Sequence, residues 1–257
     1  MIGRRTVNLT VCPFAMCLGR FKMFSKQQPK LQSYSKRTYS RFKYINPTLL
    51  NGRFIKEKKI IQNFDFFLIL DFEATCEKNG TLNPQEIIEF PCLKMNSKTL
   101  EIESHFHQYV MPELNPVLTP FCVELTGILQ EMLVGQPNFV TCMELFEEWM
   151  AKENLLHSKF ALVTCGDWDL KVMFPAQCKL SGIAVPSYMK QWINIKKTYG
   201  EATGRYGHSL MAMLKSFNLS HVGRLHSGID DCLNMANIVR KLAVRHAFGI
   251  NGLLNDS

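Results

Sequence analysis

The sequence predicts an α/β domain in which helices flank a mixed β-sheet. The uninterrupted apolar run of a strand at 66–71 is typical of a strand that is covered on both faces. Two further strands are expected at 87–95 and 101–110, joined by a short turn that makes them antiparallel neighbours. Strands and helices alternate after that point, and this combination favours a mixed sheet between helices.

Each later element is predicted by its own pattern. Thr119 or Pro120 suits the start of a helix that runs through Glu131. Residues 139–152 place their apolar side chains on one helical face, and apolar residues recur at the same spacing in the last helix, 230–244. The remaining predicted elements are strands at 160–164 and 192–195 and helices at 168–180 and 208–217.

Charge is distributed unevenly along the 257 residues. Residues 1–56 contain 12 Lys or Arg and no acid, whereas the rest of the chain contains 18 basic and 22 acidic residues. No apolar run approaches the ~20 residues that span a bilayer. The nine cysteines are scattered and include no Cys-x-x-Cys pair, so neither a disulfide framework nor a zinc site is predicted. We expect a soluble intracellular protein without a membrane partner.

Three segments are expected on this basis: a basic leader at 1–59, a single domain at 60–250 and a tail at 251–257. The leader is rich in Arg, Lys, Ser and Tyr, a composition that is typical of a mitochondrial transit peptide. A basic arm that binds phosphates and a dispensable extension are the alternatives, and either would leave the protein in the cytoplasm or nucleus.

The most informative motif is an acidic pair at the end of the first strand. Asp71 and Glu73 are two residues apart, so an extended backbone directs both side chains to the same side. Two neighbouring carboxylates repel each other unless a cation lies between them, and hard oxygen ligands suit Mg²⁺ or Mn²⁺. The pair therefore predicts a metal site at one edge of the sheet.

Two other segments supply groups that the same edge would collect. Asp169 follows the fourth strand, and Asp231 lies at the start of the last helix, five residues after His226. Active sites of open α/β sheets form at the carboxyl ends of the strands. Two cations can clamp the oxygens of an in-line phosphoryl displacement, and a neutral histidine can take a proton from water. Phosphodiester hydrolysis is the reaction that these groups fit best.

The motifs resemble, in order and spacing, the DEDD-type 3′-to-5′ exonucleases with the histidine variant. Among these they are most similar to the enhanced-RNAi (Eri-like) exoribonucleases of the prion-protein-interacting or Snipper-like kind. The matching stretches are FLILDFEATC at 67–76, QEIIEFP at 85–91, LTPFCVELTGI at 118–128, VTCGDWDLKVM at 163–173, QWINIKKTYG at 191–200 and HSGIDDCLNMANI at 226–238. The resemblance implies a ribonuclease H-like sheet of the DnaQ exonuclease type.

The same resemblance implies a role for each acidic residue. Two Mg²⁺ ions, with Mn²⁺ as a substitute, would be held by Asp71, Glu73, Asp169 and Asp231. His226 would act as the general base. Glu73 would be a catalytic residue as well as a metal ligand. The neighbouring Asp167 is expected to be a cap or supporting residue, and Asp230 a helix N-cap.

A pocket for the terminal nucleotide is also implied by the resemblance. Its candidate residues are Phe72, Ala74, Thr75, Leu125, Thr126, Gly127, Ile128 and Trp168. Gly127 would permit the close approach of a sugar or base. Phe72 and Trp168 adjoin the acids and would either stack on bases or pack in the core.

The expected function is a 3′-to-5′ exonuclease that releases nucleoside monophosphates from single-stranded or 3′-overhanging RNA. DNA is a further candidate substrate, because the choice of sugar depends on contacts to one 2′-OH. The rival hypotheses are a DNA-preferring exonuclease and an inactive nucleic-acid-binding adaptor with the same fold. The complete set of five groups favours an enzyme over the adaptor, and no protein partner is predicted.

Overall fold

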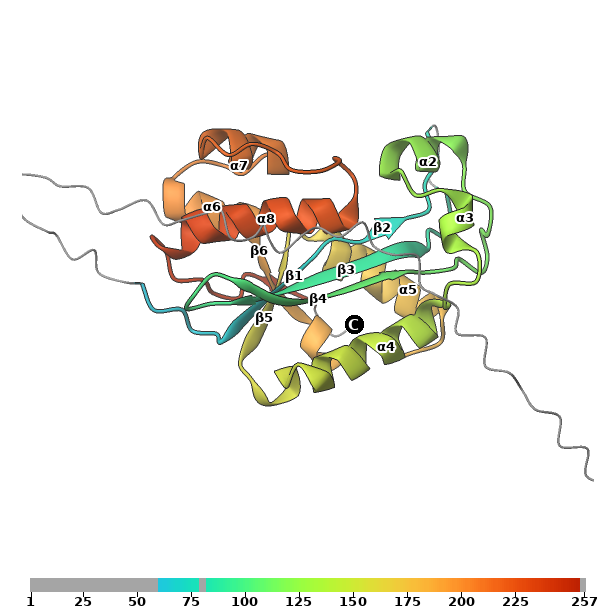
Figure 1. Ribbon diagram of the computed structural model, residues 1–257, viewed down its shortest axis with the longest axis horizontal. Helices are drawn as coiled ribbons and strands as arrows, with labels where there is room; N and C mark the ends of the chain where they lie inside the picture. The colour runs from blue at the N-terminus through green and yellow to red at the C-terminus, as the bar shows by residue number, and fades with distance from the viewer. Residues whose placement is uncertain (1–59, 79–81, 255–257) are drawn as a thin grey trace, which may run out of the picture. The chain divides into compact units, whose positions relative to one another are not determined.

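The computed structural model describes residues 60–78 and 82–254, which form a mixed β-sheet with helices on both faces (Figure 1). The predicted leader at 1–59 lies outside the described residues, as do residues 79–81 and 255–257. Within the described part of the chain, no helix is both long and apolar enough to cross a membrane.

The sheet has seven strands in the order β2-β3-β1-β5-β6-β7, with β4 paired to β3. The strands are β1 (Phe66–Leu70), β2 (Glu73–Ala74), β3 (Ile87–Asn96), β4 (Ile102–Tyr109), β5 (Phe160–Thr164), β6 (Gln191–Asn194) and β7 (Gly252–Leu253). β3 runs antiparallel to β1, whereas β5 is parallel to both β1 and β6. The carboxyl ends of β1, β5 and β6 consequently meet at one edge of the sheet. The predicted mixed sheet is confirmed.

Helices cover both faces because alternate side chains of β1 belong to two separate cores. Leu68 and Leu70 pack with residues of α4 and α5, whereas Phe67 and Ile69 pack with residues of α6, α7 and α8. Figure 1 shows α4 and α8 on opposite faces of the sheet. The α-helices are α2 (Pro120–Thr126), α3 (Gln130–Leu133), α4 (Phe139–Lys152), α5 (Phe174–Leu180), α6 (Ile195–Thr203), α7 (Leu210–Ser216) and α8 (Gly228–Ala243). Short 3₁₀ turns form at Leu155–His157 and Ser187–Met189.

Two helices differ from the sequence-based prediction for identifiable reasons. The helix expected through Glu131 is divided, because Gly127 ends α2 in the left-handed conformation with a φ of 74°. The helix expected at 168–180 starts as a π-helical turn, Asp169–Met173, before α5. Pro175 has no N–H to donate to the carbonyl of Lys171, so a regular α-helix cannot continue through this segment.

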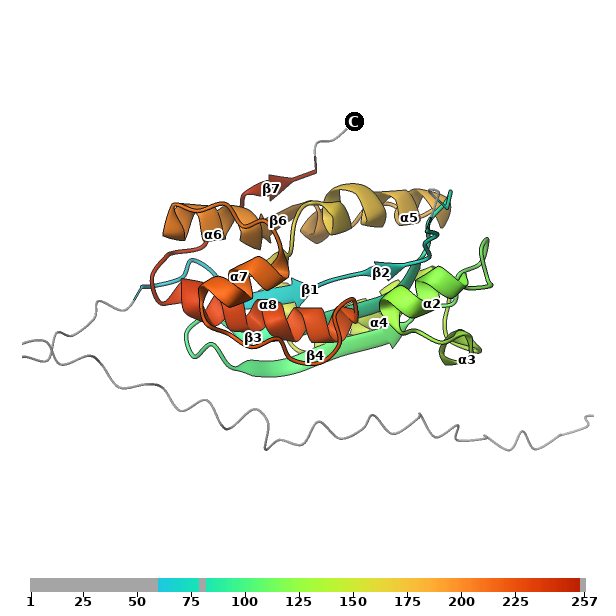
Figure 2. The ribbon, with the colours of Figure 1, turned by 90° about the horizontal axis from the view of Figure 1, so that it is seen from above.

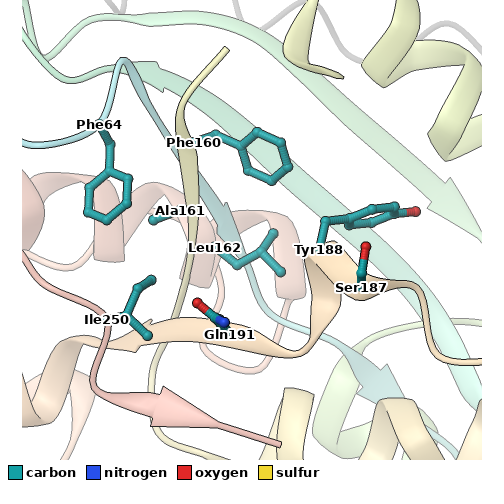
Figure 3. A pocket seen from close by; sticks show the side chains of 8 residues that line it. All are labelled: Phe64, Phe160, Ala161, Leu162, Ser187, Tyr188, Gln191 and Ile250. Atoms are coloured by element: carbon teal, nitrogen blue, oxygen red, sulfur yellow. The ribbon is translucent and has the colours of Figure 1, made fainter. Parts of the chain in front are cut away.

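A pocket opens at the amino end of β5, and Figure 3 labels the residues that line it. Phe160 and Leu162 of β5 lie on one side, with Tyr188 and Gln191 across from them. Its lining contains no Asp, Glu, His, Lys or Arg, so the pocket offers no acid, base or metal ligand. The ionisable groups gather instead at the carboxyl end of the same strand.

Candidate functional site

The edge formed by the carboxyl ends of β1 and β5 brings together all four predicted acids. Asp71 and Glu73 follow β1, and Asp231 reaches them from the first turn of α8. One oxygen from each of these three side chains lies within 4.8 Å of the other two. Asp169 lies beside them. Its Oδ1 accepts a hydrogen bond of 3.0 Å from the backbone N–H of Phe72, the residue between Asp71 and Glu73. These four carboxylates are called the acidic cluster below.

Burial raises the pKa of each carboxyl of the acidic cluster, and repulsion by neighbouring acids adds to the shift at Asp71 and Glu73. The pKa of Asp71 lies well above its ordinary value, chiefly because of burial and then because of the charges of Asp169 and Glu73. Burial, followed by the charge of Glu89, raises the pKa of Glu73 to about 9. Burial also raises the pKa of Asp169 to about 6 and shifts that of Asp231 upwards. A cation between these groups would favour their ionised forms and reverse the shifts.

One oxygen of the cluster lacks a hydrogen bond within the described residues. Asp231 Oδ1 is buried, and the basic group of His221, at Nε2, is 3.7 Å away, which is too far for a hydrogen bond. A buried acceptor without a partner is costly, and a cation would satisfy it. The donor set consists of carboxylate oxygens, the ligands that hard divalent cations prefer. The residues present therefore fit a divalent metal site.

His226 lies at the rim of the acidic cluster with an exposed side chain. Its backbone N–H donates a hydrogen bond of 3.1 Å to Asp231 Oδ2. The φ of His226 is 59°, a left-handed conformation that non-glycine residues seldom adopt. Such a conformation persists only where the surroundings fix it, and it is found most often at functional sites. The structure thus brings all five residues of the predicted constellation to one place.

Glu89 and His107 lie next to the acidic cluster and help to hold it in place. Neither residue was predicted from the sequence. Glu89 is buried in β3 directly opposite Glu73 in the strand register. Its two oxygens contact His107 Nε2 at 2.7 Å and the backbone N–H of Gly228 at 3.0 Å. A side chain on Gly228 would collide with the Asp71 carbonyl, since a Cβ would lie 2.7 Å from it. Glu89 therefore holds the first residue of α8 against the end of β1. The sequence does contain one signal for Glu89, which is that an acidic residue interrupts the apolar run of β3.

Two acids next to the cluster have other partners. Asp167 accepts hydrogen bonds of 2.9 Å from both Trp192 and Asn194 and pairs with Lys197 at 3.0 Å. This agrees with the supporting role expected for it. Asp230 is not the N-cap of the last helix, because α8 already begins at Gly228. Its Oδ2 instead accepts the backbone N–H of Arg224 at 2.8 Å and so fixes the preceding loop.

The candidate nucleotide-binding residues divide into buried and accessible groups. The buried side chains are those of Phe72, Ala74, Thr75, Thr126 and Ile128. The Phe72 ring packs against Phe90 and Phe174, so it offers no free face to a base. Trp168 is 41% exposed beside Asp169, and Leu125 and Gly127 are partly exposed. Contact with a nucleotide through side chains is thereby limited to Trp168 and Leu125, with the backbone of Gly127.

A lysine near the cluster was also missed. Lys196 lies in the first turn of α6, and its Nζ stands close to Gly166, where an added Cβ would be 3.9 Å from it. Gly166 has a φ of 130°, a conformation that suits glycine, and lies three residues before Asp169. The approach of α6 to this turn depends on the packing of β6 beside β5, which no sequence period reveals.

Comparison with known proteins places the chain in a nuclease family. The profile of the RNase T family, described as exonuclease, matches residues 68–239. The chain therefore belongs to this exonuclease family, and the resemblance to Eri-like enzymes of the DEDDh type is confirmed.

Individual relatives have names that specify the activity of those proteins. ERI1 exoribonuclease 3 of Homo sapiens is 57% identical over 187 residues, which cover 72% of this chain and 55% of that protein. The chain thus spans about half the length of that relative. The 3′-5′ exoribonuclease 1 of Mus musculus is 36% identical over 244 residues, covering 89% of this chain and 70% of that protein.

Solved structures support the same fold. The nuclease domain of 3′hExo, a DEDDh family member bound to rAMP, has a TM-score of 0.72 and 38% identity, covering 75% of this chain and 98% of that domain. Cell-death related nuclease 4 has a TM-score of 0.68 and 32% identity, covering 74% of this chain and 68% of that one. Membership of the DEDDh group implies dependence on a divalent metal, for which the acidic cluster is the fitting site.

Proposed function

We propose that this chain is a 3′-to-5′ exonuclease that hydrolyses RNA from a free 3′ end and releases nucleoside monophosphates. The observation that carries the proposal is the acidic cluster, in which oxygens of Asp71, Glu73 and Asp231 lie within 4.8 Å of one another. The relatives support the choice of substrate, because they are named exoribonucleases. The similar nuclease domain of 3′hExo, which is bound to rAMP, points to the same class of substrate.

The acidic cluster would hold two divalent cations, Mg²⁺ in the proposed reaction with Mn²⁺ as a substitute. When bound, such ions stabilise the charge that develops on the attacking and leaving oxygens of a phosphodiester. Contacts within the fold orient the side chains that would hold these ions. The Phe72 N–H donates to Asp169, and the His226 N–H donates to one oxygen of Asp231. The other oxygen of Asp231 has no hydrogen bond among the described residues.

His226 is the proposed general base. Its exposed ring stands at the rim of the cluster, on a backbone that is tied to Asp231. A neutral imidazole can take a proton from water near pH 7 as the water attacks phosphorus. The bond from phosphorus to the 3′-oxygen of the preceding nucleotide then breaks. The departing 3′-oxygen takes a proton from solvent water, so the strand keeps a new 3′-hydroxyl, and the terminal nucleotide leaves with a 5′-phosphate.

Recognition of the 3′-terminal nucleotide of the RNA is assigned to Trp168, Leu125 and Gly127. The exposed Trp168 ring adjoins Asp169 and provides a surface on which the terminal base can stack. Gly127 and Leu125 lie at the end of α2, where partly exposed backbone can approach a sugar closely. A terminal nucleotide between these surfaces would present its phosphate to the acidic cluster.

The experiment compares matched 22-nucleotide RNA and DNA oligonucleotides that carry either a 3′-hydroxyl or a blocked 3′ end. We expect stepwise shortening of the unblocked RNA with Mg²⁺ or Mn²⁺ and no reaction in EDTA. Preference for DNA would favour the DNA exonuclease, and equal cleavage of blocked ends would contradict the exonuclease. Binding without hydrolysis by the unaltered chain would identify the inactive adaptor.

The basic leader at 1–59 is proposed to be a mitochondrial targeting signal. Its support is compositional: 12 Lys or Arg and no acid within residues 1–56. Fusion of residues 1–59 to a fluorescent reporter tests it in cells. Mitochondrial signal with processing of the fusion is expected, and diffuse cytosolic or nuclear signal would contradict the proposal.

A further inference from the structure

Arg224 connects the loop that carries His226 to the end of α2. Its guanidinium donates a hydrogen bond of 3.0 Å from Nη1 to the carbonyl of Leu125 and another from Nη2 to the carbonyl of Glu124. Carbonyls in the last turn of a helix have no partner within the helix, so these oxygens are natural acceptors for a cationic donor. The contact joins segments that are 99 residues apart in the sequence.

Gly127 provides the room that this contact needs. A Cβ on Gly127 would lie 2.5 Å from Arg224 Nη1, well inside the limit for two heavy atoms that are not bonded. The left-handed φ of 74° at Gly127 also turns the chain away from α2 at this point. The guanidinium consequently lies directly against the glycine that the sequence assigns to the nucleotide pocket.

The backbone of the loop is fixed on its other side by α8. Arg224 N–H donates to Asp230 Oδ2 at 2.8 Å, and Val222 exchanges two hydrogen bonds with the side chain of Asn234. His226 N–H donates to Asp231. Figures 1 and 2 both show the segment before α8 on the side of that helix that faces α2. Arg224 is the residue of this loop whose side chain reaches α2 through hydrogen bonds among the described residues.

We propose that Arg224 is a positioning residue for His226, which it acts on by fastening the histidine loop to the α2 terminus. The proposal rests on the proposed exonuclease function. This link holds His226, the proton acceptor, in a fixed position relative to the surface that would receive the terminal nucleotide. Without it the backbone contacts to α8 remain, but the loop loses its second support and the imidazole is free to shift. A displacement of about 1 Å in a reacting group can lower the rate about 10²-fold.

The first measurement separates kcat from KM for Arg224→Ala on an RNA oligonucleotide with a 3′-hydroxyl. A fall in kcat of about 10²-fold is expected, with KM changed by less than about threefold. Arg224→Lys should recover part of kcat, because an ammonium can still donate to one of the two carbonyls. Arg205→Ala is the control for loss of an exposed arginine elsewhere and should match the unaltered enzyme. A change in KM alone would show that Arg224 binds substrate and would overturn the proposal.

The decisive measurement is a double-mutant cycle with His226→Ala. If Arg224 acts through His226, Arg224→Ala should cause less than about a twofold further loss of kcat in the His226→Ala background. Losses that multiply would mean that the two side chains act independently, and the positioning role would be wrong. Mn²⁺ affinity, measured by calorimetry, should stay within about twofold of the unaltered protein in each variant.

Folding and function are controlled separately. If Arg224→Ala does not fold, Arg224→Met takes its place in the same cycle, because it keeps a long side chain but has no N–H donor for the two carbonyls. An unaltered chain that does not degrade RNA would contradict the proposed function and this inference together. An active unaltered chain with multiplying losses would contradict the inference alone.

Discussion

Asp167 and Asp169 are two residues apart, yet their surroundings have opposite electrostatic effects. Burial alone would raise the pKa of Asp167, but hydrogen bonds from Lys197, Asn194 and Trp192 lower it below its ordinary value. At Asp169, burial outweighs the hydrogen bond from the Phe72 backbone and raises the pKa to about 6. An acid that is already paired within the fold has a structural role. An acid that shares a buried edge with other acids requires a ligand from outside.

The largest effect should separate these two neighbours. Asp169→Asn is expected to lower kcat more than about 10²-fold, because removal of a ligand should cost more than the 10–100-fold typical of the residues that support ligands. Asp167→Asn should keep kcat within about threefold, since an amide oxygen can still accept from Trp192 and Asn194. Steady-state rates of RNA degradation at saturating substrate give both values. The reverse pattern would mean that Asp167, not Asp169, serves the site.

The next effect concerns the proton acceptor rather than the cation ligands. His226→Ala should lower kcat by about 10²–10⁴-fold, because the change removes the imidazole that is proposed to take the proton of the attacking water. Its affinity for Mn²⁺ should change little, since the hydrogen bond from His226 to Asp231 comes from the backbone N–H, which alanine keeps. Calorimetric titration with Mn²⁺ and the steady-state rate test the two parts. Loss of metal affinity would make His226 a ligand, and an unchanged rate would make it structural.

A smaller effect is expected for Glu89, because its carboxylate already has hydrogen-bond partners within the fold. Glu89→Gln should lower the free energy of unfolding by about 1.5–3 kcal/mol, because charged hydrogen bonds to His107 and Gly228 are weakened. Activity should fall about 10-fold as the start of α8 loosens. Denaturant unfolding measures the first and an RNA degradation assay the second.

Glu103 of β4 offers a matched control for this change. Its side chain is 39% exposed and 3.7 Å from Lys94, so Glu103→Gln should cost less than about 1 kcal/mol. An equal loss of stability in the two variants would show that the position of Glu89 beneath the cluster has no special importance.

The sequence was sufficient for features that depend on short-range pattern. The apolar run of β1 predicts a buried strand, and the spacing of Asp71 and Glu73 then predicts two carboxylates on one side of its end. The start of α8 was placed two residues late, because Asp230 resembles an N-cap in sequence. In the fold its carboxylate is used by the Arg224 backbone instead.

Features that depend on tertiary contacts could not be predicted from sequence patterns. Phe72 and Trp168 both adjoin a predicted ligand, but only the packing of Phe72 against Phe174 shows which ring is buried. The contact of Arg224 with the end of α2 spans 99 residues. The approach of Glu89 to Glu73 follows from strand register, which a single sequence does not specify.

Thermal unfolding with and without Mn²⁺ tests most directly whether the acidic cluster is built for a cation. In EDTA the melting temperature should fall as pH rises from about 5 to about 8. Glu73 and Asp169, with folded pKa values of about 9 and about 6, bind protons more tightly in the folded state than in the unfolded state. Their stabilising contribution is complete below the ordinary carboxyl pKa and is lost as pH rises through the folded values. Glu73→Gln should remove much of this slope.

At about pH 8, Mn²⁺ at about 100 times its Kd should raise the melting temperature of the unaltered protein by about 5–10 °C. Asp167→Asn should retain this increase and Asp231→Asn should lose it, because only the second change removes an oxygen of the cluster. A melting temperature that is insensitive to Mn²⁺, or an increase that survives in Asp231→Asn, would contradict the account.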